Sequence, residues 1–213
     1  MNPIRPARRR WRAGVAALLA AVCPLLLAVL AAPSAAAAGP SSVIRASTTW
    51  SATVASTSCP TVYWGSLPKV SAATTVRPIT NVRTGQHPCF DRMVVDLGSG
   101  SGTAGYQVRY VDRVYSQGRG TVVPVAGGAR IEVVVHAPAY RVSTGTATYR
   151  PADSRHLTNV TGYATFRQLA WGGSFEGQTT IALGVRARLP MRVFILAGPG
   201  TGQRLVIDVA HHW

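Results

Sequence analysis

Apolar and polar residues alternate with a period of two along much of the chain after about residue 75. In several segments every second residue is large and apolar, and the residues between are mostly polar or charged. A β-strand turns successive side chains to opposite faces of a sheet, so this period predicts strands with one buried face. The apolar positions are Tyr106, Val108 and Tyr110, then Ile131, Val133 and Val135, and finally Leu205, Ile207 and Val209.

A longer run with the same period extends from Phe175 to Val185 and predicts a further strand. The pair Gly127-Gly128 stands where a tight hairpin turn needs a positive φ, which glycine adopts without strain. We therefore expect short strands joined by frequent turns. Other glycine-rich stretches that predict turns are 98–105, 118–120, 172–173 and 198–202.

No segment after residue 38 combines ten or more residues with helical spacing of apolar side chains and with helix caps. About eight or nine short strands without intervening helices are typical of two antiparallel sheets packed face to face, because each sheet must cover its apolar face. The sequence therefore predicts an all-β fold, an antiparallel two-sheet β-sandwich. A closed β-barrel is the alternative.

The first 38 residues differ from the rest of the chain and have the features of an export signal. Five arginines lie within residues 5–12, residues 13–32 are apolar and uncharged, and the alanines at 35–38 offer cleavage sites. We predict a signal peptide at 1–38, helical in its apolar part, that is removed after export. The alternative is a retained membrane anchor, since about 20 apolar residues can span a bilayer.

Residues 39–74 are predicted to form a linker and arm before the folded domain at 75–213. The linker is rich in Ser, Thr and Ala and has few apolar anchors, so we expect it to be irregular or disordered. Cys59 and Cys89 are the cysteines left after removal of the signal, and such a pair in an exported chain predicts a disulfide that tethers the arm. A zinc site is the weaker alternative, because it needs about four ligands at recognisable spacing.

Charged residues are sparse, at 14% of the chain, but basic residues far outnumber acidic ones, with 22 Lys and Arg against 7 Asp and Glu. Removal of the five arginines of the predicted signal leaves 17 basic residues against the same 7 acidic ones. Such an excess attracts polyanions, and the attraction weakens as salt rises. Outside a cell those polyanions are wall polymers or lipid headgroups. Nucleic acid is not an expected partner, because export removes the chain from it.

Three segments resemble the AMIN-like domain of exported actinobacterial proteins, namely 87–96 (HPCFDRMVVD), 105–111 (GYQVRYV) and 204–211 (RLVIDVAH). The segment 64–69 (WGSLPK) is similar to the arm that often precedes this domain. The resemblance covers Cys59 to Trp213 and identifies the domain at 75–213 as AMIN-like. It implies a β-sandwich related to AMIN domains, which are non-catalytic modules that tether cell-wall amidases and secretins to the envelope, in part by binding peptidoglycan.

The sequence lacks the motifs of common catalytic sites. The glycine-rich segments 98–102 and 198–202 lack the Gly-Lys-Ser/Thr ending of a nucleotide loop, and no zinc-hydrolase or nucleophile-elbow motif occurs. Seven acidic residues also leave few candidates for a paired-carboxylate site. We therefore predict no catalytic residue, no metal site and no cofactor. Asp91, Arg92 and Asp208 are predicted to stabilise strand ends and corners through charge-assisted hydrogen bonds.

The predicted ligand-binding surface is basic. If the strands that carry four arginines share one sheet, their guanidiniums cover one face and suit phosphate or carboxylate groups; a solvated sheet surface is the alternative. Tyr63 and Trp64 in the arm are predicted either to contact a ligand or to pack against the domain. The four arginines in the polar phase of separate strands are Arg109, Arg130, Arg186 and Arg204. Other aromatics available for sugar stacking are Tyr115, Tyr140, Tyr149 and Trp171.

These features together favour a secreted or envelope-associated, non-catalytic binding module whose partner is peptidoglycan or an anionic wall polymer. An exported scaffold or inhibitor that grips another envelope protein by a sheet edge is the first alternative. A secreted wall hydrolase is the second. No stable transmembrane segment is expected once the signal peptide is removed.

Overall fold

The computed structural model describes residues 59–213; the predicted signal peptide and the predicted linker at 39–58 lie outside the described residues. The described part contains eleven strands. None of its residues belongs to a helix long and apolar enough to cross a membrane. The strands are β1 (Lys69–Ser71), β2 (Ile79–Gln86), β3 (Phe90–Leu97), β4 (Gly105–Val111), β5 (Val114–Tyr115), β6 (Val122–Val123), β7 (Ala129–His136), β8 (Phe166–Phe175), β9 (Gln178–Val185), β10 (Met191–Ala197) and β11 (Gln203–Ala210).

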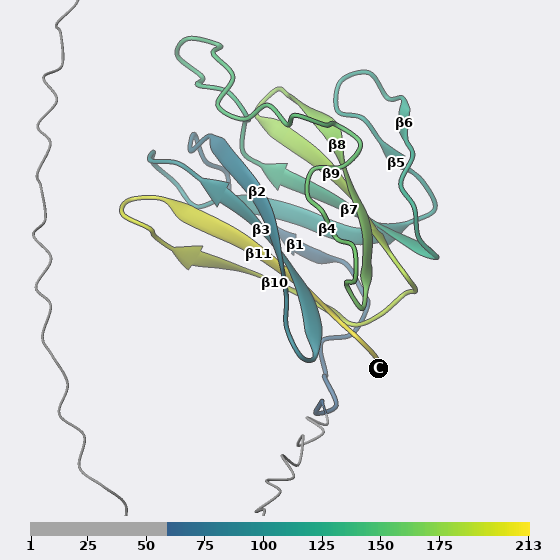
Figure 1. Ribbon diagram of the computed structural model, residues 1–213. Coiled ribbons are helices and arrows are strands. Elements are labelled where there is room, and N and C mark those ends of the chain that lie inside the picture. Colours follow the sequence, from purple (N-terminus) through teal and green to yellow (C-terminus); the bar gives the residue numbers. More distant parts are fainter. Residues whose placement is uncertain (1–58) are drawn as a thin grey trace, which may run out of the picture. The chain divides into compact units, whose positions relative to one another are not determined.

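The long strands form two antiparallel sheets that pack as a sandwich (Figure 1). One sheet has five strands in the order β1-β4-β7-β9-β8, and the other has four in the order β10-β11-β3-β2. The short strands β5 and β6 pair with each other in a separate hairpin. The all-β fold and the two-sheet β-sandwich predicted from the sequence are confirmed.

The predicted apolar positions of the strands point into the space between the two sheets. They form one core together with Met93 and Val95 of β3 and Phe166 and Leu169 of β8. Burial of each such side chain stabilises the folded state by about 1.5–3 kcal/mol, because its apolar surface leaves water. The residues between them therefore face outward, so the outer faces of the sheets carry the polar side chains. The fully buried residues of the predicted phase are Val108, Ile131, Val133, Val135, Leu205, Ile207 and Val209.

Most of the run from Phe175 to Val185 is the strand β9, as predicted, but its first three residues belong to the end of β8 and to a turn. β8 ends at Phe175 and β9 begins at Gln178. Glu176 and Gly177 lie between them with φ values of 48° and 77°, the two positive angles that a tight two-residue turn needs. The period of two continues through this turn without interruption, so periodicity alone does not locate it.

Two glycine pairs predicted as turns have other roles. Gly172 and Gly173 lie inside β8, where the pairing of β8 with β9 shifts register. Gly127-Gly128 joins β6 to β7, and Gly127 has the predicted positive φ, of 133°. These two strands do not pair with each other, so the predicted hairpin is wrong. A Cβ on Gly128 would lie 2.2 Å from the carbonyl oxygen of Arg186. Glycine is needed there because two backbone segments approach closely.

The β5–β6 hairpin covers part of the outer face of the five-stranded sheet, on the side away from the four-stranded sheet (Figure 1). Val114 and Val125 pack on Ala170 of β8 and Ala182 of β9 in a second, small core. Small residues permit this approach, since a Cβ on Gly184 would lie 1.8 Å from the carbonyl oxygen of Ala126. Apolar side chains outside the main sandwich are therefore also buried.

The arm before β2 is held to the sandwich at three places. The predicted disulfide between Cys59 and Cys89 is present, with a Cα–Cα distance of 5.3 Å. The carbonyl oxygen of Gly65 accepts the backbone N–H of Met191 at 2.9 Å. β1 pairs with β4 and forms one edge of the five-stranded sheet. Part of the segment assigned to the arm by sequence is therefore a strand of the sandwich.

Candidate functional site

Two of the four predicted arginines lie on the same outer face of the five-stranded sheet. Arg109 on β4 is the register partner of Glu132 on β7, and Arg130 precedes Glu132 by two residues on the same strand. Residues two apart on a strand share a face, so all three side chains point away from the core. Val111 is the register partner of Arg130, which places the two arginines on neighbouring rungs of the same pair of strands.

Two hollows adjoin at this end of the sheet. They share Val111, the last residue of β4, and Asp112, the first residue of the link from β4 to β5. The larger, of about 560 Å³, is lined by Arg109, Val111, Asp112, Arg113, Tyr115 and Glu132. The smaller, of about 200 Å³, is lined by Tyr110, Val111, Asp112, Gly128, Ala129, Arg130 and Arg188. We name this site the basic corner, after its arginines Arg109, Arg113, Arg130 and Arg188.

The basic corner places four guanidiniums beside two carboxylates, those of Asp112 and Glu132. Arg109 Nε donates to Glu132 Oε2 at 2.8 Å. The side chain of Glu132 is 10% exposed and that of Arg109 is 44% exposed, so the carboxylate is covered while the guanidinium stays accessible. The side chains of Arg113 and Arg130 form no ion pair with the residues that the structure describes. Accessible guanidiniums in excess suit a phosphate or carboxylate ligand.

Arg188 is positioned by the arm and by an aromatic ring. Its Nε donates to Ser66 Oγ at 3.1 Å, and its guanidinium carbon lies 5.2 Å from the centre of the Tyr110 ring. The Tyr110 hydroxyl donates to the carbonyl oxygen of Leu189 at 2.8 Å and accepts the Leu189 N–H at 2.9 Å. Burial raises the pKa of Tyr110, so the hydroxyl stays neutral and keeps both bonds. The arm therefore helps to fix one arginine of the basic corner.

The other two predicted arginines lie elsewhere. Arg204 is on β11 in the four-stranded sheet, and its Nη2 donates to the carbonyl oxygen of Ala197 at 2.9 Å. Arg186 follows β9 and donates to the carbonyl oxygen of His211. The condition for one face with all four arginines is not met, because β11 belongs to a different sheet from β4 and β7. The alternation along a strand shows which side chains face outward. It does not show which of the two sheets the strand belongs to.

A comparison with models of known protein families shows which family this chain belongs to. The model of the AMIN-like domain matches residues 77–211, which extend from just before β2 to just after β11. The chain belongs to the AMIN-like domain family. No curated protein and no solved structure matches it. AMIN-like domains are typically extracytoplasmic binding modules, and at the level of the family they target the cell envelope.

The two arm aromatics of this AMIN-like domain differ in exposure. Tyr63 is 94% exposed. The Trp64 ring lies 4.3 Å from the guanidinium carbon of Arg192 and meets the Phe90 ring edge-on, with 5.8 Å between ring centres. Neither aromatic lines the hollows of the basic corner. Trp64 therefore packs against the four-stranded sheet, which is one of the two outcomes predicted for it.

Asp208 binds two arginines on the outer face of the four-stranded sheet. Arg92 donates to it through Nε at 2.7 Å and through Nη2 at 2.9 Å, and Arg192 donates through Nε at 2.8 Å. The Asp208 side chain is fully buried. Its hydrogen bonds raise the pKa of Arg92 above the ordinary arginine value. These are charge-assisted bonds of the kind predicted for Arg92 and Asp208.

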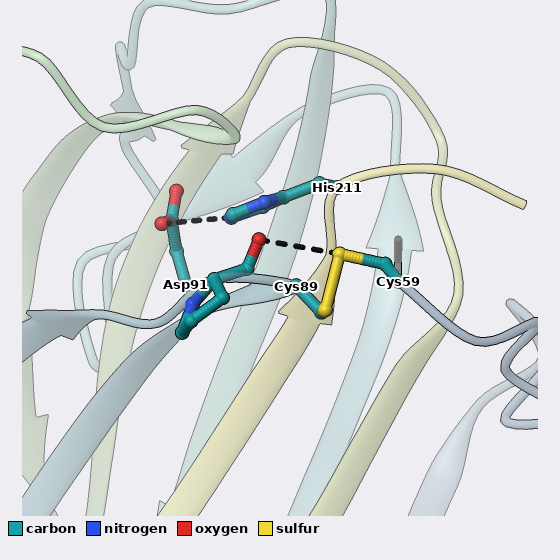
Figure 2. Close-up of a disulfide and its surroundings, with 5 residues drawn as sticks. Cys59, Cys89, Asp91 and His211 are labelled. Atoms are coloured by element: carbon teal, nitrogen blue, oxygen red, sulfur yellow. Dashed lines mark hydrogen bonds and ion pairs between the residues drawn. A yellow bond between two sulfur atoms is a disulfide. The ribbon is translucent and has the colours of Figure 1, made fainter. Parts of the chain in front are cut away.

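Asp91 is buried beside the disulfide, where Figure 2 shows it next to His211. Its Oδ2 accepts the backbone N–H groups of Thr165 and Phe166 at 2.7 and 2.9 Å. His211 Nε2 lies 3.2 Å from Asp91 Oδ1, and the His211 N–H donates to the carbonyl oxygen of Cys89 at 3.0 Å. Asp91 thus connects β3 with the start of β8 and with the residue that follows β11.

The described residues of the AMIN-like domain contain two His–Asp pairs, Asp91–His211 and Asp153–His156. In neither pair does the imidazole bond to a serine hydroxyl within residues 59–213. The backbone N–H of Arg155 lowers the pKa of the exposed Asp153, and the bond from His156 lowers it further. No group of three or more His, Cys, Asp or Glu in this part of the chain could hold a metal ion. The basic corner has the groups to bind an anion, and a nucleophile with its base is not among its lining residues.

Two arginines of the basic corner were missed by sequence reasoning, which considered only the polar phase of predicted strands. Arg113 lies in the link between β4 and β5, and Arg188 lies between β9 and β10. Connecting segments meet at the ends of a sandwich, where charged side chains from different links gather. Arg113 lies three residues after Tyr110 and Arg188 three residues after Val185, the last apolar positions of two predicted strands, and this nearness to a strand end was the available indication.

Proposed function

We propose that this AMIN-like domain is a non-catalytic module that binds peptidoglycan or an anionic wall polymer outside the cell through the basic corner. The observation that carries the proposal is the gathering of Arg109, Arg113, Arg130 and Arg188 around two adjoining hollows. Phosphates of wall polymers and carboxylates of peptide stems are the anions that guanidiniums bind with paired hydrogen bonds. Family membership supports the envelope as the place of binding.

A sugar contact is also available at the basic corner. Tyr115 lines the larger hollow together with Arg113 and is 48% exposed. An exposed aromatic ring offers an apolar face and a hydroxyl, both of which suit a sugar ring. A polymer that alternates sugars with anionic groups therefore meets a matching side chain for each part. This combination favours a glycopolymer over a simple inorganic anion.

Export is part of the proposal. The arginine-rich start, the apolar run and the alanines within residues 1–38 support it, as does the disulfide between Cys59 and Cys89. Disulfides persist outside the cytosol and are rare within it. In this account the domain meets its polymer after the signal peptide has been removed.

The test is sedimentation of the protein, purified from cells that export it, with isolated wall sacculi across a salt series. We expect binding that weakens as salt rises, because exposed charges are screened at high ionic strength. The double variant Arg113→Gln/Arg130→Gln removes two guanidiniums that form no ion pair with the described residues. Its affinity should fall by about three- to tenfold.

The matched control is Arg141→Gln/Arg150→Gln, which removes the same charge from two exposed arginines outside the basic corner. This control should bind like the unmodified protein. Equal loss of affinity in both double variants would show that net charge alone acts, and retention unchanged by salt would reject the electrostatic account. Specific capture of one envelope protein, without affinity for sacculi, would favour the scaffold alternative.

A further inference from the structure

A pocket of about 720 Å³ lies beside the start of β8, and the basic corner does not include it. One wall is the loop at 156–163, and the rest is formed by Phe166, Arg167 and Gln168 of β8. Pockets of about 300–1,000 Å³ are typical of sites for small organic ligands. Neither the anionic-polymer proposal nor family membership assigns a role to this pocket.

The loop that forms the pocket is anchored to the edge strands of both sheets. On β8, the Leu157 N–H donates to the carbonyl oxygen of Leu169 at 2.9 Å, and Gln168 Nε2 donates to the carbonyl oxygen of Arg155 at 2.8 Å. On β2, Thr84 Oγ1 donates to Thr158 Oγ1 at 3.2 Å. β2 and β8 are edge strands of different sheets. The pocket is therefore preformed at the side where the two sheets would otherwise open to solvent.

The lining of the pocket is continuous with the hydrophobic core. Leu157, Val160 and Tyr163 pack against the core cluster that contains the fully buried Phe166. The rings of Tyr163 and Phe166 lie nearly parallel, with an interplanar angle of 13° and 6.1 Å between their centres. A ligand that enters beside these residues leaves water for an aliphatic and aromatic surface. Such a surface stabilises an apolar chain or ring.

The charge at the pocket is positive. Arg167 lines it, and none of its described lining residues is Asp or Glu. The carboxylate of Asp153 lies beside the pocket, with Oδ2 2.9 Å from Nδ1 of the lining His156. Arg167 is fixed by backbone carbonyl groups, since Nη1 donates to Tyr163 and Phe166 at 2.9 Å each and Nη2 donates to Ala164 at 3.3 Å. These bonds leave its Nε–H and one Nη2–H without a partner among residues 59–213. Both nitrogens therefore keep a donor that can bind a carboxylate or phosphate beside the guanidinium.

We propose that this pocket binds a small amphiphile whose apolar body lies against Leu157, Val160 and Tyr163 and whose single anionic group binds Arg167. The shape, the apolar lining and the preoriented guanidinium act together. A neutral apolar molecule would use the lining alone, and an inorganic anion would use Arg167 alone. The combination therefore selects for molecules that carry both parts.

The test uses sodium decanoate, below the concentration at which it forms micelles, as the probe and decanol as its uncharged match. We expect saturable binding of decanoate to the full chain, with NMR contacts between the probe and the methyl groups of Leu157 and Val160. The variant Arg167→Gln should weaken decanoate about tenfold, as expected for loss of a charge-assisted pair of hydrogen bonds, and should leave decanol nearly unchanged. The matched control is Arg141→Gln, an exposed arginine that does not line the pocket.

Absence of saturable decanoate binding, or probe contacts confined to other methyl groups, would overturn the proposal. Equal affinities of the unmodified protein for decanoate and decanol would overturn the role of Arg167. This last comparison needs no variant, so it decides the question even if Arg167→Gln does not fold. A negative result with decanoate would not affect the proposal for the basic corner, because the two sites share no lining residue.

Discussion

Among the described residues, Asp208 is an acidic residue that pairs with two arginines. One fully buried carboxylate accepts hydrogen bonds from both Arg92 and Arg192. Both guanidiniums also lie near aromatic rings, with the carbon of Arg92 5.1 Å from the Phe90 centre and that of Arg192 5.4 Å from the Phe194 centre. Cation–π contacts add to the ion pairs when the cation is partly desolvated. The carboxylate is therefore the common anchor of an arginine and aromatic cluster.

The change Asp208→Asn should destabilise the domain by about 2–3 kcal/mol, because it removes the charge that strengthens the hydrogen bonds from Arg92 and Arg192, while these partly exposed guanidiniums remain in contact with water. The control is Asp96→Asn on the same sheet, whose carboxylate pairs with the 49% exposed side chain of Arg83. That exposed pair contributes about 0–1 kcal/mol. Urea unfolding measures both variants. Equal free energies of unfolding for the two variants would contradict the structural role assigned to Asp208.

At the scale of elements, the arm links the disulfide to the basic corner. The chain runs from Cys59 through Trp64, which packs on Arg192, to Ser66, which bonds to Arg188. The disulfide limits the freedom of this segment in the unfolded chain and keeps it near the sandwich in the folded one. Stability and the position of Arg188 in the basic corner therefore depend on the same cross-link.

Replacement of both cysteines, Cys59→Ser/Cys89→Ser, should lower the free energy of unfolding by about 3.6 kcal/mol in the chain-entropy model, for a loop of 30 residues. The measurement is urea unfolding of the variant and of the unmodified protein, each with and without a reducing agent. Reduction should bring the unmodified protein to the midpoint of the variant and leave the variant unchanged. Coincident midpoints of oxidised protein and variant would contradict a stabilising cross-link.

Strand periodicity predicted the elements well where one face of a strand is buried and the other is wet. β11 was predicted from the same period although Val206 and Asp208 on its outer face are buried too. β4 and β7 follow the rule more closely, so their buried positions could be read directly. β9 does not, because the β5–β6 hairpin buries Ala182 on its outer face while Leu183 faces the core. When both faces of a strand are buried, apolar and polar residues no longer alternate, and the period of two becomes weak. The turn at 176–177 was missed because Gly177 falls in the same phase as Phe175 and Thr179 and does not interrupt the period of two.

The candidate site could be predicted only in part. Arg109 and Arg130 were identified because strand phase shows which side chains face outward. Arg113 and Arg188 come from links between strands, and their approach depends on which strands are neighbours in the sheet. Sheet order arises from long-range pairing, which local sequence does not encode. The same limit explains why Arg204 was grouped with arginines of the other sheet.

At the scale of the whole molecule, the two outer faces differ in the state of their arginines. On the four-stranded sheet Arg83 pairs with Asp96, and Arg92 and Arg192 pair with Asp208. Arg204 of that sheet donates to the carbonyl oxygen of Ala197, and Arg109 of the basic corner pairs with Glu132. At the basic corner Arg113 and Arg130 form no ion pair with the described residues. An external anion gains more from a guanidinium whose charge is not already compensated. The guanidiniums of Arg113 and Arg130, which are free of ion pairs within residues 59–213, support the proposal that the basic corner is the binding face.

Arginine modification by phenylglyoxal, read by mass spectrometry with and without solubilised wall fragments, tests the central claim most directly. It reports on the side chains that are proposed to bind. Bound fragments should protect Arg113 and Arg130 from modification and leave Arg141 and Arg150 as reactive as before. Unchanged labelling of Arg113 and Arg130 under conditions where fragments bind, or protection confined to arginines of the four-stranded sheet, would contradict the account.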